Sequence, residues 1–249
     1  MGNGRILEVQ HNFQSNVLLV YDLMNFDETI LNFGIDSLKD LISRQKKFNI
    51  TNPLATAEST LRNFENIRQN GSLRPKYNEI FNQCVVLLVS YFSSAIGDIF
   101  KVALTQKINQ GMDDNLAKEE IKVTLAELQN CSSEMLGELV VLKKEISFQD
   151  MQSIRRVFQT YLDIDIEKDQ NVNNIITGQA CRHVIVHSGA IIDKRLIKQI
   201  SQATPRDIKP EIKTGEKIQF DPEEIKIVGE SMKRYINGVI EKLDQICIY

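Results

Sequence analysis

A long segment of apolar periodicity, residues 77–107, constrains the fold of this chain most. Its hydrophobic residues recur at intervals of three and four, which is typical of one long α-helix with a continuous buried face. They are Phe81, Cys84, Val85, Leu88, Phe92, Ala95, Ile96, Ile99 and Ala103. Near the start of the segment the opposite side is apolar too, with Val86, Leu87, Val89 and Tyr91. A helix that is apolar nearly all round lies at the centre of a bundle or spans a membrane.

The polar residues of this segment favour the bundle. The continuous apolar run covers only residues 84–89, whereas about 20 apolar residues are needed to span the hydrocarbon core of a bilayer. Polar and charged residues follow at once, at Ser90, Ser93, Ser94 and Asp98. We therefore expect a central bundle helix and no contact with a membrane.

Shorter stretches of helical periodicity predict further helices around this centre. They cover residues 12–46 (with weak points at 25–27 and 32–34, so that two helices are possible), 54–69, 116–128, 132–144 and 171–200. Ser147 is the predicted N-cap of another helix, with Asp150 at its third position. The last helix begins at Asp221-Pro222-Glu223-Glu224, where a cap residue, a proline and a glutamate agree.

Only residues 217–220 resemble a strand, so the predicted fold class is all-α. The loop at residues 70–76 divides the chain into an N-terminal helical extension, residues 1–74, and a helical domain, residues 75–249. This loop is too short for a free linker, so we expect the two parts to pack together.

The composition and the N-terminus indicate how the protein could contact nucleic acid, which state its cysteines have and where in the cell it is expected. A net charge of −3 means that any contact with nucleic acid must use a local basic patch. The four cysteines, Cys84, Cys131, Cys181 and Cys247, are scattered and are best interpreted as free thiols. The N-terminus has no apolar core of signal-peptide type, and a cytoplasmic location is therefore expected.

The stretch 171–193 holds the residues that are most suggestive of chemistry. It contains two of the three histidines, His183 and His187, with Arg182 beside them, in an otherwise apolar segment. Burying an arginine and a histidine is costly unless the groups are paired or functional. Arg182 and His187 lie about 140° apart around a helix axis, so a second copy of the helix could complete one site.

Arg182-His183-Val184-Ile185-Val186-His187 resembles the R-polar-x-x-x-H signature of the HEPN superfamily, and the resemblance covers about residues 75–246. The continuation Ser188–Asp193 resembles a subgroup in which Asn follows the histidine. Ser188 stands here instead, and the glycine comes one place early, at Gly189. Such domains often carry an acidic residue on the first core helix, near the position of Ser93.

This resemblance implies a HEPN-type helical bundle that acts as a homodimeric, metal-independent endoribonuclease in a toxin or phage-defence system. It implies His187 as general acid and base, Arg182 as transition-state stabiliser and His183 as a helper. Residues expected to bind the RNA are Ser188, Lys194, Arg195 and Lys198. The expected partners are RNA, a second copy of the chain and a cognate antitoxin or other regulatory protein.

Two alternatives stay open at the level of sequence. His183 and His187 are spaced for a metal ion, but further ligands are not evident, so no metal and no other cofactor is expected. The domain could also be a non-catalytic module that binds a partner protein or a nucleotide, with Arg182 and His187 as structural residues. Substitution of His187 by alanine distinguishes the two, because it is expected to abolish cleavage in an enzyme and mainly to lower stability in such a module.

Overall fold

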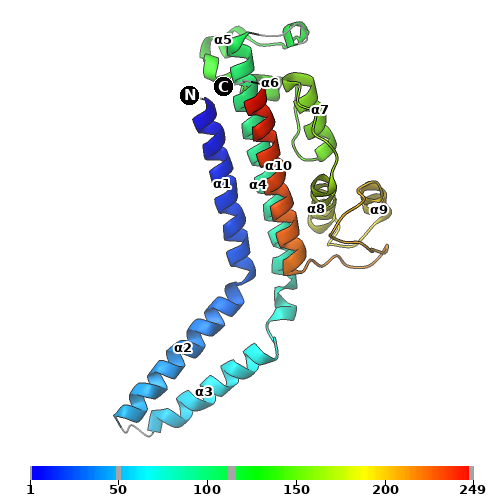
Figure 1. The fold of residues 1–249 in the computed structure, drawn as a ribbon. Coiled ribbons are helices and arrows are strands. Elements are labelled where there is room, and N and C mark those ends of the chain that lie inside the picture. Colours follow the sequence, from blue (N-terminus) through cyan, green and yellow to red (C-terminus); the bar gives the residue numbers. More distant parts are fainter. Residues whose placement is uncertain (1, 49–51, 112–115, 247–249) are drawn as a thin grey trace.

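The chain folds into a bundle of helices with a helical hairpin projecting from one end (Figure 1). The structure is a computed structural model, and it describes residues 2–48, 52–111 and 116–246. The α-helices are α1 (Gly2–Met24), α2 (Phe26–Lys47), α3 (Asn52–Gln69), α4 (Arg74–Gln110), α5 (Leu125–Asn130), α6 (Leu136–Lys143), α7 (Met151–Leu162), α8 (Gln170–His187), α9 (Lys194–Ser201) and α10 (Pro222–Gln245). Two 3₁₀ turns, η1 (Leu116–Lys118) and η2 (Ser133–Met135), complete the described part.

The predicted all-α fold is confirmed. Among the described residues the β-structure consists of one isolated bridge, between Ile191 and Lys217, at the place where the sequence indicates a strand. Residues 217–220 therefore form no strand of their own, because the ladder is one pair long.

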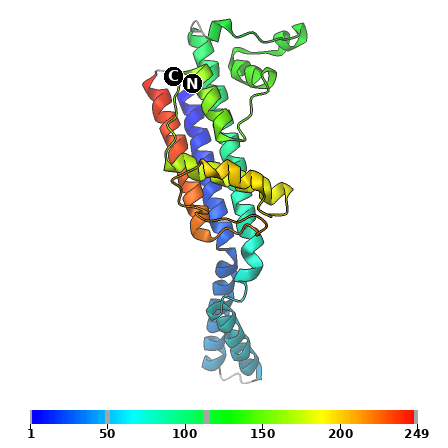
Figure 2. The ribbon, with the colours of Figure 1, turned by 90° about the vertical axis from the view of Figure 1, so that its right-hand side faces the viewer.

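Helix α4 is the centre of the bundle, as its apolar periodicity predicts. Every residue of its predicted stripe is buried. α1 and α10 lie along α4, and α8 lies across the bundle in Figure 2. Within the described residues, one helix, at residues 79–110 of α4, is long and apolar enough to cross a membrane. However, 56% of its apolar 18-residue window is buried inside the protein, as in a bundle core.

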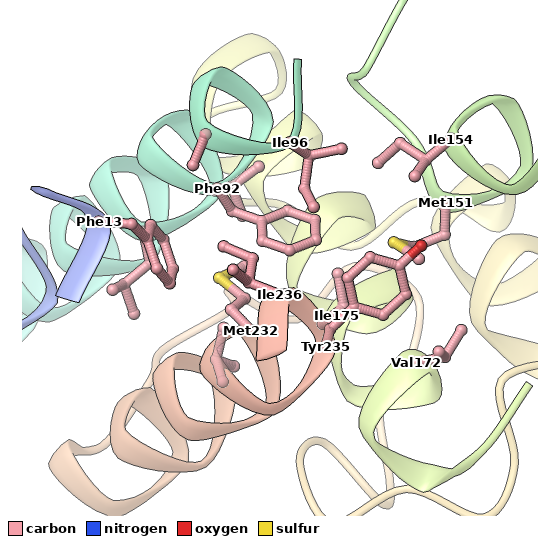
Figure 3. Close-up of a cluster of buried hydrophobic side chains, with 14 of the residues drawn as sticks. Phe13, Phe92, Ile96, Met151, Ile154, Val172, Ile175, Met232, Tyr235 and Ile236 are labelled. Carbon is pink, nitrogen blue, oxygen red and sulfur yellow. The ribbon is translucent and has the colours of Figure 1, made fainter. Parts of the chain in front are cut away.

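The core forms where these helices meet α7 (Figure 3). Phe92 packs edge-on against Phe13 of α1 and Tyr235 of α10, with ring centroids 6.3 Å and 5.6 Å apart. On the side of Phe92 away from Phe13, the buried Ile175 of α8 and Ile154 of α7 complete the hydrophobic cluster. Side chains from residue 13 to residue 236 thus share one hydrophobic interior.

Residues 1–74 divide their packing between two places. α1 packs on α4 and α10, within the bundle, whereas α2 and α3 pack on each other and project from it (Figure 1). The chain bends between α1 and α2 at Asn25, at the first of the two predicted weak points. The second predicted weak point, at residues 32–34, is wrong, because α2 runs through it without a break while its buried Ile35 packs toward α3. The division at residue 74 as a domain boundary stays a prediction.

Two local predictions are wrong. The predicted helix at residues 116–128 is helical only at Leu116–Lys118 and Leu125–Asn130, because Leu116 alone is buried among those of its apolar side chains that the structure describes. The cap of α7 is Asp150, whose side chain accepts a hydrogen bond from the Ser153 amide, rather than Ser147. The carboxylate lies next to the first turn, so it satisfies a free amide that Ser147 is too far back to reach.

Candidate functional site

Helix α8 is anchored at its start by polar side chains that face a neighbouring loop. Asp169 caps the helix by accepting a hydrogen bond from the Val172 amide. The buried Asn174 donates to Asp207 at 3.0 Å and to Ser231 at 3.2 Å, and Asn173 donates to the Pro205 carbonyl at 2.9 Å. These bonds fix α8 against the loop before α10, and they therefore set where its other end lies.

At that other end the chain turns sharply through two left-handed residues. Gly189 has φ 59° and Ala190 has φ 64°, and the Ser188 and Ala190 amides both donate to the Val184 carbonyl. Ile192 then pairs with Glu216 and Gly215 through backbone hydrogen bonds. Ser188 and Gly189 thus end α8, and Ser188 is exposed. A Cβ at residue 189 would meet no atom within 4 Å, so this turn is open.

His183 and His187 lie together on one face at the end of α8. Their ring centroids are 4.8 Å apart with a 50° angle between the planes. His187 is exposed and His183 is partly exposed. The pKa of His183 is lowered from its ordinary value, first by desolvation and then by the positive charge of Arg195, with Asp193 opposing the shift. A neutral imidazole at neutral pH can act as a base or as a hydrogen-bond acceptor.

The basic residues that follow α8 separate into two groups. Lys194, Arg195 and Lys198 are exposed on α9, and none of them has an ion-pair partner among the described residues. Arg206 and Lys209 have structural roles instead. Arg206 donates to the carbonyls of Ile200, Ala203 and Lys209, and Lys209 pairs with Glu224 and lies over the Phe220 ring.

Arg182 points into a different place, a cleft of about 460 Å³ between α8, α4 and the loop before α7. The lining residues are Val89, Ser90, Ser93, Ser94, Ile146, Ser147, Phe148, Gln149 and Arg182. Arg182 is the one charged residue in this lining. Its Nε and the Oγ of the buried Ser93 are buried atoms that have no hydrogen-bond partner among the described residues. A guanidinium beside hydroxyls suits a phosphoryl or carboxylate group.

The sequence missed the partners of Arg182 in this cleft. Phe148 supplies an aromatic ring near Arg182, although no aromatic residue occurs between residues 162 and 220. Ser93 had a sequence signal, because it occupies the position where HEPN-like domains often carry an acid. Phe148 had none, since it comes from a loop that only tertiary packing brings to α8.

The structure therefore separates Arg182 from the two predicted histidines. His183, His187 and Arg195 form one group, and Arg182 belongs to the serine-lined cleft about a third of a turn away around α8. Across the described residues no three or more His, Cys, Asp or Glu side chains gather as a metal site would require. Cys84 and Cys181 are buried free thiols and Cys131 is a partly exposed one, while Cys247 lies outside the described residues.

Comparison with protein-family models, with curated proteins and with solved structures gave no match to this chain.

Proposed function

We propose that the protein is a metal-independent endoribonuclease of HEPN type. The observation that carries this proposal is the contact of two imidazoles at an exposed helix end, 4.8 Å apart, next to unpaired cations. Two adjacent histidines can exchange protons with a substrate near neutral pH, and the cations of α9 can hold the backbone of RNA.

The reaction needs no metal because RNA carries its own nucleophile. The 2′-hydroxyl attacks the adjacent phosphorus, its proton passes to a base, and the P–O5′ bond breaks as an acid protonates the 5′-oxygen. The products are a 2′,3′-cyclic phosphate and a free 5′-hydroxyl. His187 exchanges the protons, His183 orients the substrate or His187, and Arg182 stabilises the crowded phosphorane.

The position of Arg182 on α8 means that this mechanism requires a second copy of the chain. Arg182 and His187 lie about 140° apart around α8, so one protomer does not present both to the same phosphate directly. A homodimer with two α8 helices facing one cleft would place an arginine from one copy beside the histidines of the other. We propose such a dimer as the active form, with RNA as substrate and a toxin or defence role in the cytoplasm.

A second candidate is a non-catalytic module that binds a nucleotide or another phosphorylated ligand. The cleft around Arg182 favours it, because an unpaired guanidinium, a buried unpaired hydroxyl and an aromatic ring line one hollow. In that case ligand binding requires Arg182 and Ser93, and His187 is dispensable.

Incubation of the purified protein with structured RNA in EDTA tests the proposed activity. Wild type is expected to leave 2′,3′-cyclic phosphate ends, and His187→Ala to lose cleavage by at least about a hundredfold, the lower end for a proton-transfer group. His11→Ala is the matched control, because His11 is exposed on α1, away from α8. Cleavage that persists in His187→Ala, or that requires added Mg²⁺ or Zn²⁺, would reject this mechanism.

A further inference from the structure

A stripe of large apolar side chains, interrupted by the exposed Ser37 and Arg44, runs along the outside of α2 and the end of α1. It consists of Leu19, Leu23, Phe26, Ile30, Phe33, Leu41 and Phe48, which are between 36% and 72% exposed. At about 100° per residue, the five from Phe26 to Phe48 lie within an arc of about 80° around α2 and its C-cap, whereas Leu19 and Leu23 lie on α1, before the bend at Asn25. We call these seven residues the outer stripe.

Helix α2 is apolar on two opposite sides, and only one of them is covered. The inner side holds the buried Ile35 and Ile42, and it packs on α3. There the helices approach closely, because a Cβ on Gly34 would lie 2.8 Å from the Phe64 ring. The ion pairs of Lys39 with Glu65 and of Lys46 with Glu58 also join α2 to α3. The hairpin is therefore complete without the outer stripe.

The size of the outer stripe matches an interface. Taking about 200 Å² for each large apolar side chain, the exposed fractions amount to roughly 800 Å². Contiguous apolar patches above a few hundred Å² mark interaction sites, and a stable interface buries about 800 Å² on each partner. Three of the seven side chains are phenylalanines, a residue type that is enriched in such interfaces.

The charges beside the outer stripe indicate what covers it. Between Arg5 and Lys39 the sequence has no lysine or arginine, whereas residues 39–47 carry four basic residues and one acid. By helical geometry Asp22 and Asp36 lie along one edge of the stripe; Lys47 lies on the same edge and Arg44 within the stripe, both near its other end. Along α2 itself the sequence is thus acidic near the bundle and basic near the tip, where Arg44 pairs with Asp40 on the same helix and Lys39 and Lys46 pair with α3.

We propose that the outer stripe binds the outer stripe of a second copy of this chain, with the two α2 helices antiparallel. A two-fold axis near Phe33 brings the same edge of both helices together, as in any isologous interface. Phe33 then lies beside its own copy and Phe26 lies opposite Leu41. The acidic end of one hairpin meets the basic end of the other, with Asp22 opposite Arg44.

Other occupants fit these observations less well. The acidic half of the hairpin repels nucleic acid and anionic lipid surfaces, so neither would lie along the whole stripe. A parallel pair of hairpins would place acid against acid and base against base. Antiparallel self-association alone uses the stripe and both charged ends. The proposal is independent of the proposed function, because the hairpin projects away from α8 (Figure 1).

Sedimentation of the full-length chain tests the proposal. Phe33→Glu is expected to halve the mass of the wild-type assembly at micromolar concentration, whatever association occurs at α8. Leu142→Glu is the matched control, because Leu142 is similarly exposed on α6, outside the stripe. Circular dichroism verifies that both variants are folded. A wild type and a Phe33→Glu variant of equal mass would overturn the proposal and leave the stripe to another protein.

Covalent trapping tests the antiparallel register. The double variant Phe26→Cys, Leu41→Cys is expected to form a disulfide-linked dimer on oxidation, and Phe26→Cys alone is not. Arg44→Glu is expected to weaken association at least about tenfold, and adding Asp22→Lys is expected to restore it. A disulfide-linked dimer of the single variant Phe26→Cys, or no restoration by Asp22→Lys, would reject this register.

Discussion

At the scale of single residues, Gly137 lies at a close approach of two helices. A Cβ on this residue of α6 would lie 2.1 Å from the Lys101 carbonyl oxygen of α4, and the Gly137 amide donates to Thr105 at 2.9 Å. We expect Gly137→Ala to destabilise the protein by about 3 kcal/mol, because backbone must move to remove this overlap. Denaturant unfolding measures the change.

Gly238→Ala is the matched control for Gly137→Ala. Gly238 lies within α10, and a Cβ there would meet no atom within 4 Å. Alanine is expected to stabilise the protein by about 0.5–1 kcal/mol through helix propensity. Equal effects of the two substitutions would contradict the close approach of α6 and α4.

The pKa of His183 is a second prediction at this scale. Since the folded protein lowers it below the ordinary value of 6.5, the unfolded chain binds more protons just below that pH. The contribution of His183 to stability is therefore present at neutral pH and decreases as the pH falls through 6.5. Arg195→Gln is expected to raise the pKa of His183, as measured by NMR titration. An unchanged or lower pKa would show that Arg195 does not act on this imidazole.

At the scale of secondary structure, α10 begins with a complete capping box. The Asp221 carboxylate accepts from the Glu224 amide at 2.8 Å, and Glu224 accepts from the Asp221 amide at 3.3 Å. Asp221→Ala should cost about 1 kcal/mol, whereas Asp221→Asn should cost much less because its amide oxygen still caps the helix. Thermal unfolding of both variants measures these costs. Equal melting temperatures of Asp221→Ala and Asp221→Asn would exclude a capping role for Asp221.

The helices also show where a local sequence pattern is sufficient to predict the extent of a helix. The extent of α4 follows from its apolar periodicity, and the start of α10 follows from its capping box and the proline at its first position. The segment 116–128 has some periodicity too, but it lacks a partner that would bury it. Because most helix stability comes from packing an apolar face, the same kind of pattern gave a long helix in one place and two short turns in the other.

At the scale of the whole molecule, the bundle and the hairpin differ in how much they bury. The described interior of α2 is limited to Asp27, Ile35, Ile42 and Gln45, whereas α4 and α10 are buried along their lengths. We expect amides of α2 and α3 to exchange faster than those of α4 and α10 in mass-spectrometric hydrogen exchange. Uniform protection at low protein concentration would show that the hairpin unfolds only together with the bundle.

Sequence by itself determined the all-α class, the central helix, the bend at Asn25 and the contact of His183 with His187. Each of these follows from residues within a few turns of one helix, where spacing specifies which side chains are neighbours. Tertiary structure alone decided that Arg182, Ser93 and Phe148 line one cleft, and that one side of α2 stays uncovered. Both features depend on which distant segments pack together. The spacing of residues along one helix does not specify those tertiary contacts.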